Sequence, residues 1–153
     1  MLKPGWYLPD TDWFAQLPDT PRLDEDGQAV IGQLAQLLGD ESPVGPAVTV
    51  AANHVILLGV EHLGNAMTYA AALHDLADVA WLLCGLNLVQ AHLTQTIQRI
   101  ASNMDARAYP GTAETPDDLL RAVTDSLSTA GANSELLAAH LKEAHLLLHR
   151  DAR

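Results

Sequence analysis

The feature that most constrains this chain is a proline-free segment, residues 47–104, in which one mostly apolar series recurs at alternating steps of three and four. The members of this series, called the seam below, are Val55, Leu58, His62, Asn65, Tyr69, Ala72, Leu76, Val79, Leu83, Leu86, Gln90, Leu93, Ile97, Ile100 and Met104. This spacing is typical of α-helices that pack along one face. A second apolar stripe beside the seam indicates a helix covered on more than one side. The sequence therefore predicts an all-α helical bundle around one long central helix.

The predicted central helix is long for a chain of this size. At 1.5 Å per residue it would extend over about 87 Å. Glycine is a poor helix former, so Gly59 and the pair Gly64 and Asn65 are where we expect a kink or a break. If the helix is unbroken there, it would extend beyond its own bundle and pair with a second copy, and His62 and Gln90 could then meet their own counterparts.

Shorter helical patterns flank the central segment. Residues 24–38 begin with acidic residues, which the helix dipole favours, and Gly39 marks the end of that helix. In the last third, Thr115 and Pro116 indicate a helix start, and Gly131 indicates its end. A last helix is expected to start at Asn133 or Ser134. The sequence therefore predicts a shorter N-terminal helix and a C-terminal helical hairpin.

Residues 1–22 differ in composition from the rest of the chain. Four prolines disfavour regular structure there, and the segment carries the aromatic residues Trp6, Tyr7, Trp13 and Phe14. Aromatic side chains bury large apolar areas, so we expect this leader to dock on the helices of its own chain or of another. The predicted organisation is an extended leader over 1–22 and a single helical-bundle domain over 23–153.

The net charge of −11 is unevenly distributed, because no Lys or Arg lies between Arg22 and Arg99. Direct binding of nucleic acid or of an anionic membrane is therefore not expected. The single cysteine excludes an intrachain disulfide. No signal peptide is apparent, and the most apolar run, residues 80–89, is shorter than the roughly 20 residues that span a bilayer. These features predict a cytoplasmic protein.

Two carboxylates, Asp75 and Asp78, are three residues apart and could converge on a divalent cation. With the apolar run and Trp81 that follow, this string resembles the second metal motif of the MazG-type all-α nucleotide pyrophosphohydrolases. The resemblance covers about nine residues and implies that Asp75 and Asp78 bind Mg²⁺ for hydrolysis of a nucleoside triphosphate. The family requires an earlier pair of glutamates that are three residues apart. The chain departs from it there, because Glu61 stands at the first of these positions but Gly64 stands at the second.

Other candidate residues are histidines and one thiol. His145 and His149 share a helix face beside His140 and Glu143, which fits either a partial metal site or a solvated helix end. Cys84 lies in the most apolar run, far in sequence from any cation, so we expect a buried and unreactive thiol.

Three functions remain open from the sequence. The favoured one is a non-enzymatic interaction protein without a cofactor, which forms a homodimer or docks a protein partner. Its expected interface residues are Trp6, Tyr7, Trp13, Phe14, Leu76, Val79, Leu83, Leu86, Gln90, Leu93 and Ile97. The second is a degenerate MazG-like hydrolase that holds Mg²⁺ with Asp75, Asp78, Glu61 and His74. The third is an acidic decoy that occupies the nucleic-acid-binding site of another protein.

Overall fold

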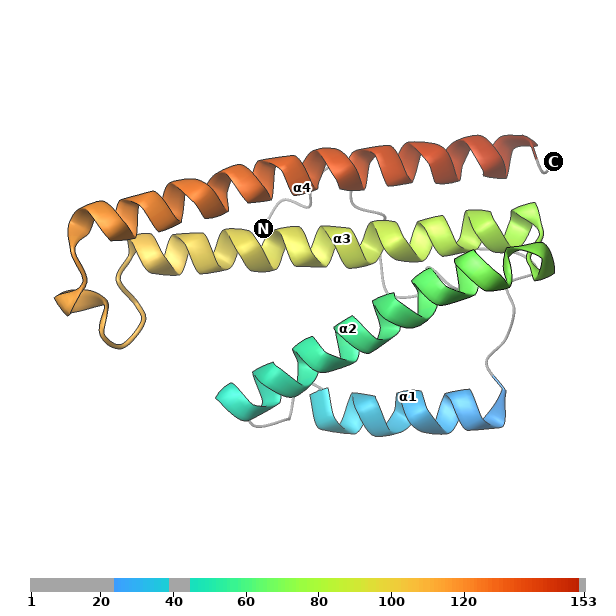
Figure 1. The fold of residues 1–153 in the computed structure, drawn as a ribbon, viewed down its shortest axis with the longest axis horizontal. Coiled ribbons are helices and arrows are strands. Elements are labelled where there is room, and N and C mark those ends of the chain that lie inside the picture. The colour runs from blue at the N-terminus through green and yellow to red at the C-terminus, as the bar shows by residue number, and fades with distance from the viewer. Residues whose placement is uncertain (1–23, 39–44, 152–153) are drawn as a thin grey trace. The chain divides into compact units, whose positions relative to one another are not determined.

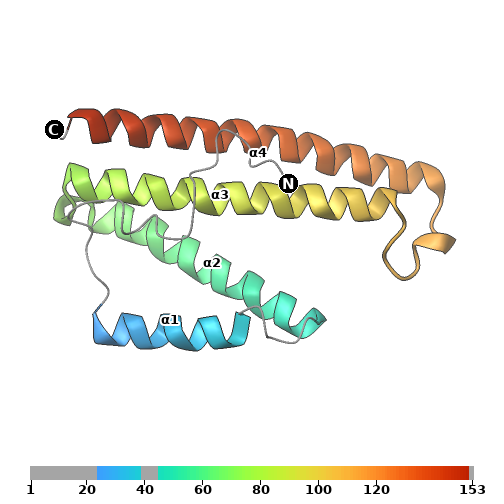
Figure 2. The ribbon, with the colours of Figure 1, turned by 180° about the vertical axis from the view of Figure 1, so that it is seen from behind.

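The computed structural model of the chain describes residues 24–38 and 45–151 (Figures 1 and 2). The leader over 1–22, with its four aromatic residues, lies outside this part. The described residues form four α-helices, α1 (Glu25–Leu38), α2 (Pro46–Tyr69), α3 (Leu76–Asp105) and α4 (Asp117–Asp151), and contain no strand. Two short 3-10 turns, η1 (Ala71–Leu73) and η2 (Thr112–Glu114), lie in the connections. The predicted all-α class is confirmed.

The chain divides into two units at the junction between Asp75 and Leu76. The N-terminal unit contains α1, α2 and η1, and the C-terminal unit contains α3, η2 and α4. The predicted single domain over 23–153 stays a prediction.

The first helix begins where the sequence predicts it. The side chain of Asp24 accepts a hydrogen bond of 2.7 Å from the backbone N–H of Gly27, which caps the helix. Glu25 and Asp26 then place negative charge in the first turn, where the helix dipole favours it. The helix ends at Leu38.

The prediction of one long central helix is wrong, and so is the predicted place of its break. The chain stays helical through Gly59 and Gly64, because a helical glycine costs only about 1 kcal/mol relative to alanine. The helix ends instead at Tyr69, and the connection up to Asp75 precedes α3. The imidazole of His74 lies 2.9 Å from the carbonyl oxygen of Ala70, and η1 uses that carbonyl as well. These local bonds replace the lost helical bonds.

The predicted hairpin within the last third is also wrong, because α4 runs unbroken through Gly131. The hairpin is formed by α3 and α4, which lie side by side and antiparallel in both ribbon views (Figures 1 and 2). Gly131 is buried, and a Cβ placed there would lie 3.2 Å from the Cγ of Gln98. This glycine therefore permits close approach of two helices and does not end one.

The end of α3 is closed by a Schellman motif. The N–H of Ala108 bonds to the carbonyl of Asn103, and the N–H of Arg107 bonds to that of Met104. Arg107 occupies the position that usually holds glycine, with a φ of 52°. Its guanidinium also pairs with Asp117 at the start of α4, so one residue ends one helix and is tied to the next.

Candidate interaction surfaces

Two buried polar side chains fix the register of the α3–α4 hairpin. The amide nitrogen of Asn87 donates to the carbonyl oxygen of Ala138 at 2.6 Å. The Nδ1 of His145 lies 2.8 Å from the carbonyl oxygen of Ala80, so in this contact Nδ1 carries the proton. Both side chains are almost fully buried. Each bond joins a side chain of one helix to the backbone of the other, which sets the axial position of the two helices.

The two bonds are separated by seven residues on each helix, which is two helical turns. Continuing the same spacing of seven, we expect Thr94 at the level of Gly131 and Ala101 at the level of Thr124. Each level therefore pairs one small residue with one polar residue. The four pairs are Ala80 with His145, Asn87 with Ala138, Thr94 with Gly131, and Ala101 with Thr124. A small residue opposite each polar one allows the helices to approach closely.

The hairpin core is made mainly of small side chains. Its buried hydrophobic residues are Ala80, Cys84, Leu88, Ala91, Ala101, Leu120 and Ala138. The larger seam residues of α3 lie beside this core: Leu83, Leu86, Leu93 and Ile97 are only partly buried, and Leu76 is 71% exposed. The seam residues therefore lie one position before the residues of α3 that are buried against α4. Its residues form a second face of α3, called the α3 outer face below.

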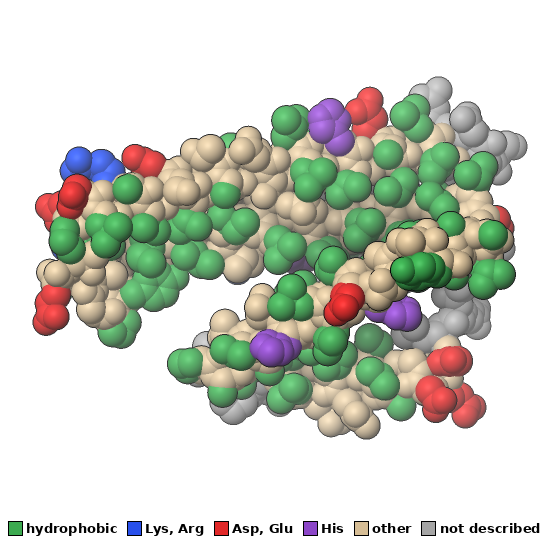
Figure 3. All heavy atoms as spheres, in the orientation of Figure 1, with side chains coloured by type: hydrophobic (Ala, Val, Ile, Leu, Met, Phe, Trp, Pro, Cys, Tyr) green, Lys and Arg blue, Asp and Glu red, His purple; other side chains and the backbone are tan. Residues whose placement is uncertain are grey.

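The N-terminal unit contains no buried residue in either of its α-helices. Among the described residues, its large apolar side chains are extensively exposed, for example Leu57 at 59% and Leu58 at 66%. The others in this group are Val30, Ile31, Leu37, Leu38, Val50, Ile56, Val60, Tyr69 and Leu73. In Figure 3 hydrophobic side chains accordingly appear at the surface over both helices. These residues form the apolar surface of the N-terminal unit.

One side of α2 carries a series of polar residues. His54, Glu61, Asn65 and Thr68 follow one another at spacings of seven, four and three, which places them within one narrow stripe of the helix. All four are exposed. Val50, Leu57 and Leu58, which are also exposed, lie within or next to this stripe, so polar and apolar side chains share this side of α2.

By length and composition alone, α2 and α3 are each long and apolar enough to cross a membrane. Both helices are longer than the apolar run over residues 80–89, which alone is too short to span a bilayer. The α3 helix packs along α4, which carries charged residues over its length. In α2, the polar stripe would lie in hydrocarbon, where each such group is costly.

The charges on the described residues of the N-terminal unit are of one sign. Its described acidic residues are Asp24, Glu25, Asp26, Glu61 and Asp75, and it contains neither Lys nor Arg among its described residues. Figure 3 shows acidic side chains gathered at one end of α1. The C-terminal unit differs, because it carries both signs. The apolar surface of the N-terminal unit therefore has acidic borders only.

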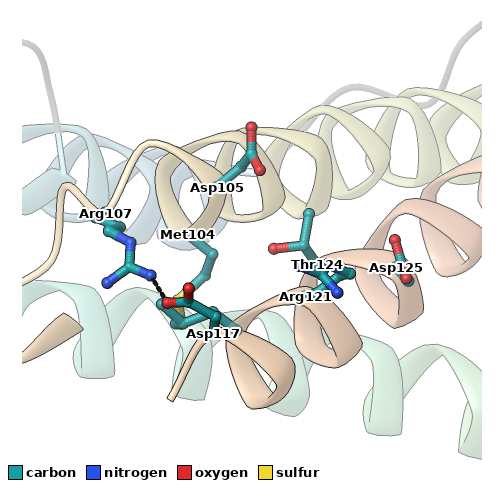
Figure 4. A pocket seen from close by; sticks show the side chains of 8 residues that line it. Met104, Asp105, Arg107, Asp117, Arg121, Thr124 and Asp125 are labelled. Carbon is teal, nitrogen blue, oxygen red and sulfur yellow. Dashed lines mark hydrogen bonds and ion pairs between the residues drawn. The ribbon is translucent and has the colours of Figure 1, made fainter. Parts of the chain in front are cut away.

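A hollow of about 260 Å³ lies where α3 ends and α4 begins (Figure 4). It is lined by Met104, Asp105, Arg107, Asp117, Leu120, Arg121, Thr124 and Asp125. Arg107 is engaged with Asp117, and its guanidinium also donates to the carbonyl oxygen of Thr112 at 3.3 Å. Two arginines among three aspartates give no consistent attraction for an ion of either sign. This hollow is an ion-paired turn, and we assign no chemistry to it.

The expected metal ligands lie in different elements. Glu61 lies on α2, Asp75 lies in the connection after η1, and Asp78 lies in the first turn of α3. Within residues 24–38 and 45–151, no three or more His, Cys, Asp or Glu side chains are grouped so that they could hold a metal ion. The Mg²⁺ set of Glu61, Asp75 and Asp78 stays a prediction.

Two other candidates are placed by the hairpin. His140 lies 3.7 Å from Glu143 as an exposed pair, whereas His145 faces α3 and bonds to it. The solvated helix end expected for His145 is therefore wrong. Cys84 is buried in the hairpin, and burial raises the pKa of its thiol. A raised pKa leaves little thiolate at neutral pH, which fits the predicted unreactive cysteine.

The residues that sequence reasoning missed are Asn87, Thr94 and His145. A signal for the first two was present, because Ala80, Asn87, Thr94 and Ala101 recur every seven residues one position after the Leu-rich seam. This series was passed over because large apolar residues are usually the buried ones. Nothing in the sequence of α4 alone indicated that His145 bonds to the backbone of α3.

Comparison of the chain with models of protein families, with curated proteins and with solved structures finds no match in any of the three. The function is therefore inferred from the chemistry of the described surfaces.

Proposed function

We propose that the chain is a non-enzymatic helical interaction protein, which self-associates or docks a partner protein through apolar helix faces. One observation carries this proposal. Among the described residues, the buried apolar side chains are mostly small, whereas the large ones are mostly half-buried or exposed. Two large residues, Leu88 and Leu120, are the exceptions on the buried side.

The energetics of burial favour a covered state. Full burial of one Val, Leu or Ile side chain contributes about 1.5–3 kcal/mol. The eleven exposed large apolar residues of the N-terminal unit are mostly near neighbours along its helices, so much apolar surface lies close together. Contiguous apolar surface of this kind marks interaction sites more often than free surface.

Self-association is assigned to the α3 outer face. Leu83, Leu86, Leu93 and Ile97 supply apolar contacts there, and Gln90 lies among them. A polar residue within an apolar helix contact sets register and subunit number, because its amide must find a hydrogen-bonding partner. A homodimer with this face at its centre is the assembly we propose. A cytoplasmic location is proposed with it, since the chain's only cysteine is a free thiol.

The test is the mass of the full chain in solution, by native mass spectrometry and light scattering across a range of concentrations. The chain should be a dimer, and Leu83→Asp should make it monomeric because it places a charge in the apolar layer. Leu119→Asp is the matched control, since Leu119 is exposed on α4 and outside this face. Circular dichroism of both variants separates loss of the dimer from loss of the fold. A folded wild-type monomer that binds no partner through either surface would refute the proposed function.

A further inference from the structure

We propose that the apolar surface of the N-terminal unit docks a basic amphipathic helix of a partner protein, that is, a helix whose apolar face is bordered by Lys or Arg. This inference rests on the proposed function and adds the chemistry of the partner. It follows from the positions of the apolar and acidic residues of the unit. The acidic residues also disfavour two other occupants, a second copy of the unit and a lipid surface.

On α1, the exposed residues Val30, Ile31, Leu37 and Leu38 repeat after seven positions and form one stripe. The acidic first turn lies at one end of that stripe, where Glu25 and Asp26 are exposed. A helix laid along the stripe would therefore meet carboxylates at one end of its apolar contact.

On α2, the exposed pair Leu57 and Leu58 precedes Glu61 by four and three residues. Side chains at these spacings are neighbours on a helix surface. A partner side chain that packs on either leucine thus lies close to the Glu61 carboxylate. Long basic side chains suit this position, because their methylene stems cover apolar surface while their charged ends reach a carboxylate.

A second copy of the same unit fits this surface poorly. Two copies would bring together surfaces that, over their described residues, carry acids and neither Lys nor Arg. Like charges placed across an interface oppose association and reject unsuitable partners. Self-association is better served by the α3 outer face, which lies in the unit with charges of both signs.

A lipid surface also fits poorly. Helices that lie on membranes usually carry Lys and Arg on their polar face, which attract anionic headgroups. The polar stripe of α2 instead contains Glu61 and no permanently cationic residue. Charge complementarity therefore favours a basic protein segment.

The probes are three designed helical peptides with the same leucine positions and with Lys, Gln or Glu at the flanking positions. Binding to the full chain is measured by fluorescence anisotropy at low and high salt. The Lys peptide should bind at least about tenfold more tightly than the Glu peptide, and its affinity should fall as salt rises because the attraction is screened. Equal binding of the three peptides, or no binding of the Lys peptide, would overturn the inference.

Variants locate the binding. The triple variant Glu25→Gln, Asp26→Asn and Glu61→Gln should weaken binding of the Lys peptide about tenfold. The matched control Glu114→Gln, Asp118→Asn and Asp125→Asn removes the same number of charges from the C-terminal unit and should leave binding unchanged. Equal weakening by both triples would mean attraction to overall charge, and would overturn the inference.

The apolar part is tested by Ile31→Asn with Leu57→Asn, which should abolish binding of the Lys peptide. Both residues are exposed, so the fold should survive, and circular dichroism checks this. If these variants abolish binding of all three peptides while the acidic triple has no effect, the proposed function stands and the basic partner does not. If the Lys peptide still binds the Asn variants unchanged, the inference fails, and dimerisation through Leu83 then decides the proposed function separately.

Discussion

The two units of this protein use apolar residues in opposite ways. In the α3–α4 hairpin, mostly small side chains are buried and polar groups bond across the contact, as Asn87 and His145 do. In the N-terminal unit, large side chains such as Leu57 are exposed, and neither α-helix contains a buried residue. The helix contact of the C-terminal unit is thus completed within the chain, whereas the large apolar side chains of the N-terminal unit are exposed among the described residues.

This difference shows that apolar content alone does not locate a core. The α2 helix is apolar enough to be compared with a membrane span, yet none of its residues is buried. The α4 helix is far more polar and still supplies Leu120 and Ala138 to the hairpin core. Close approach requires small residues at matched levels of two helices, and that match depends on both sequences together.

The largest difference in stability is expected between replacing a buried leucine and replacing an exposed one. Leu88→Ala should lower the free energy of unfolding by about 2–4 kcal/mol, because Leu88 is 8% exposed and its removal leaves a cavity. Leu58→Ala, at 66% exposure, should change it by less than about 0.5 kcal/mol. Urea unfolding followed by circular dichroism measures both. Similar losses would mean that Leu58 is covered in solution.

Glycines give the next contrast. Gly131→Leu should destabilise the hairpin by about 1–3 kcal/mol, because a larger side chain meets Gln98 and forces the helices apart. Gly64→Ala should stabilise the chain by about 0.5–1 kcal/mol, since no atom lies within 4 Å of the added Cβ and alanine favours helix. Thermal unfolding of the two variants measures these shifts. A loss of stability in Gly64→Ala would show a close neighbour at α2.

A smaller difference is expected between two asparagines. Asn87→Ala should cost about 1–2 kcal/mol, because it removes a buried hydrogen bond to Ala138 and leaves space between the helices. Asn65→Ala lies on the exposed stripe of α2 and should be neutral or slightly stabilising. Chemical denaturation compares them. Equal stabilities would mean that Asn87 does not set the register.

The smallest expected effect is at the cap of α3. Arg107→Gly relieves a left-handed backbone at an arginine, which favours the variant by about 1 kcal/mol. It also removes the exposed pair with Asp117, which contributes about 0.2–1 kcal/mol. The two terms nearly cancel, so the unfolding midpoint should hardly move. Asp117→Asn loses the pair alone and should be slightly less stable than wild type.

Some features followed directly from the sequence. The all-α class and the start of α1 at its acidic cap were predictable, because periodicity and capping are local signals. The end of α2 at Tyr69 was not, since no Gly or Pro lies between residues 65 and 75. The bonds that close it come from His74 and η1, and these depend on the geometry of the turn.

The surfaces were predictable only in part. The Leu-rich seam and the series of Ala80, Asn87 and Thr94 are both valid helical faces of α3, and sequence preference favours burial of the larger residues. The sequence of α4 decides which face of α3 is buried, because Gly131 and Ala138 leave room for polar side chains of α3. The aromatic leader residues and the α3 interface residues stay predictions.

The alternation of small and polar residues also disfavours a shift of α4 along α3 by two helical turns. A shift of α4 by seven residues in one direction would set Asn87 against His145 and leave Ala101 against Gly131, so one level would be overfilled and another hollow. A shift in the other direction would set two threonines, Thr94 and Thr124, at one level. The observed alignment is thus favoured over either of these shifts, and the bonds of Asn87 and His145 fix the axial offset between α3 and α4. A molecule that contacts both helices would therefore always meet their side chains at the same relative axial spacing.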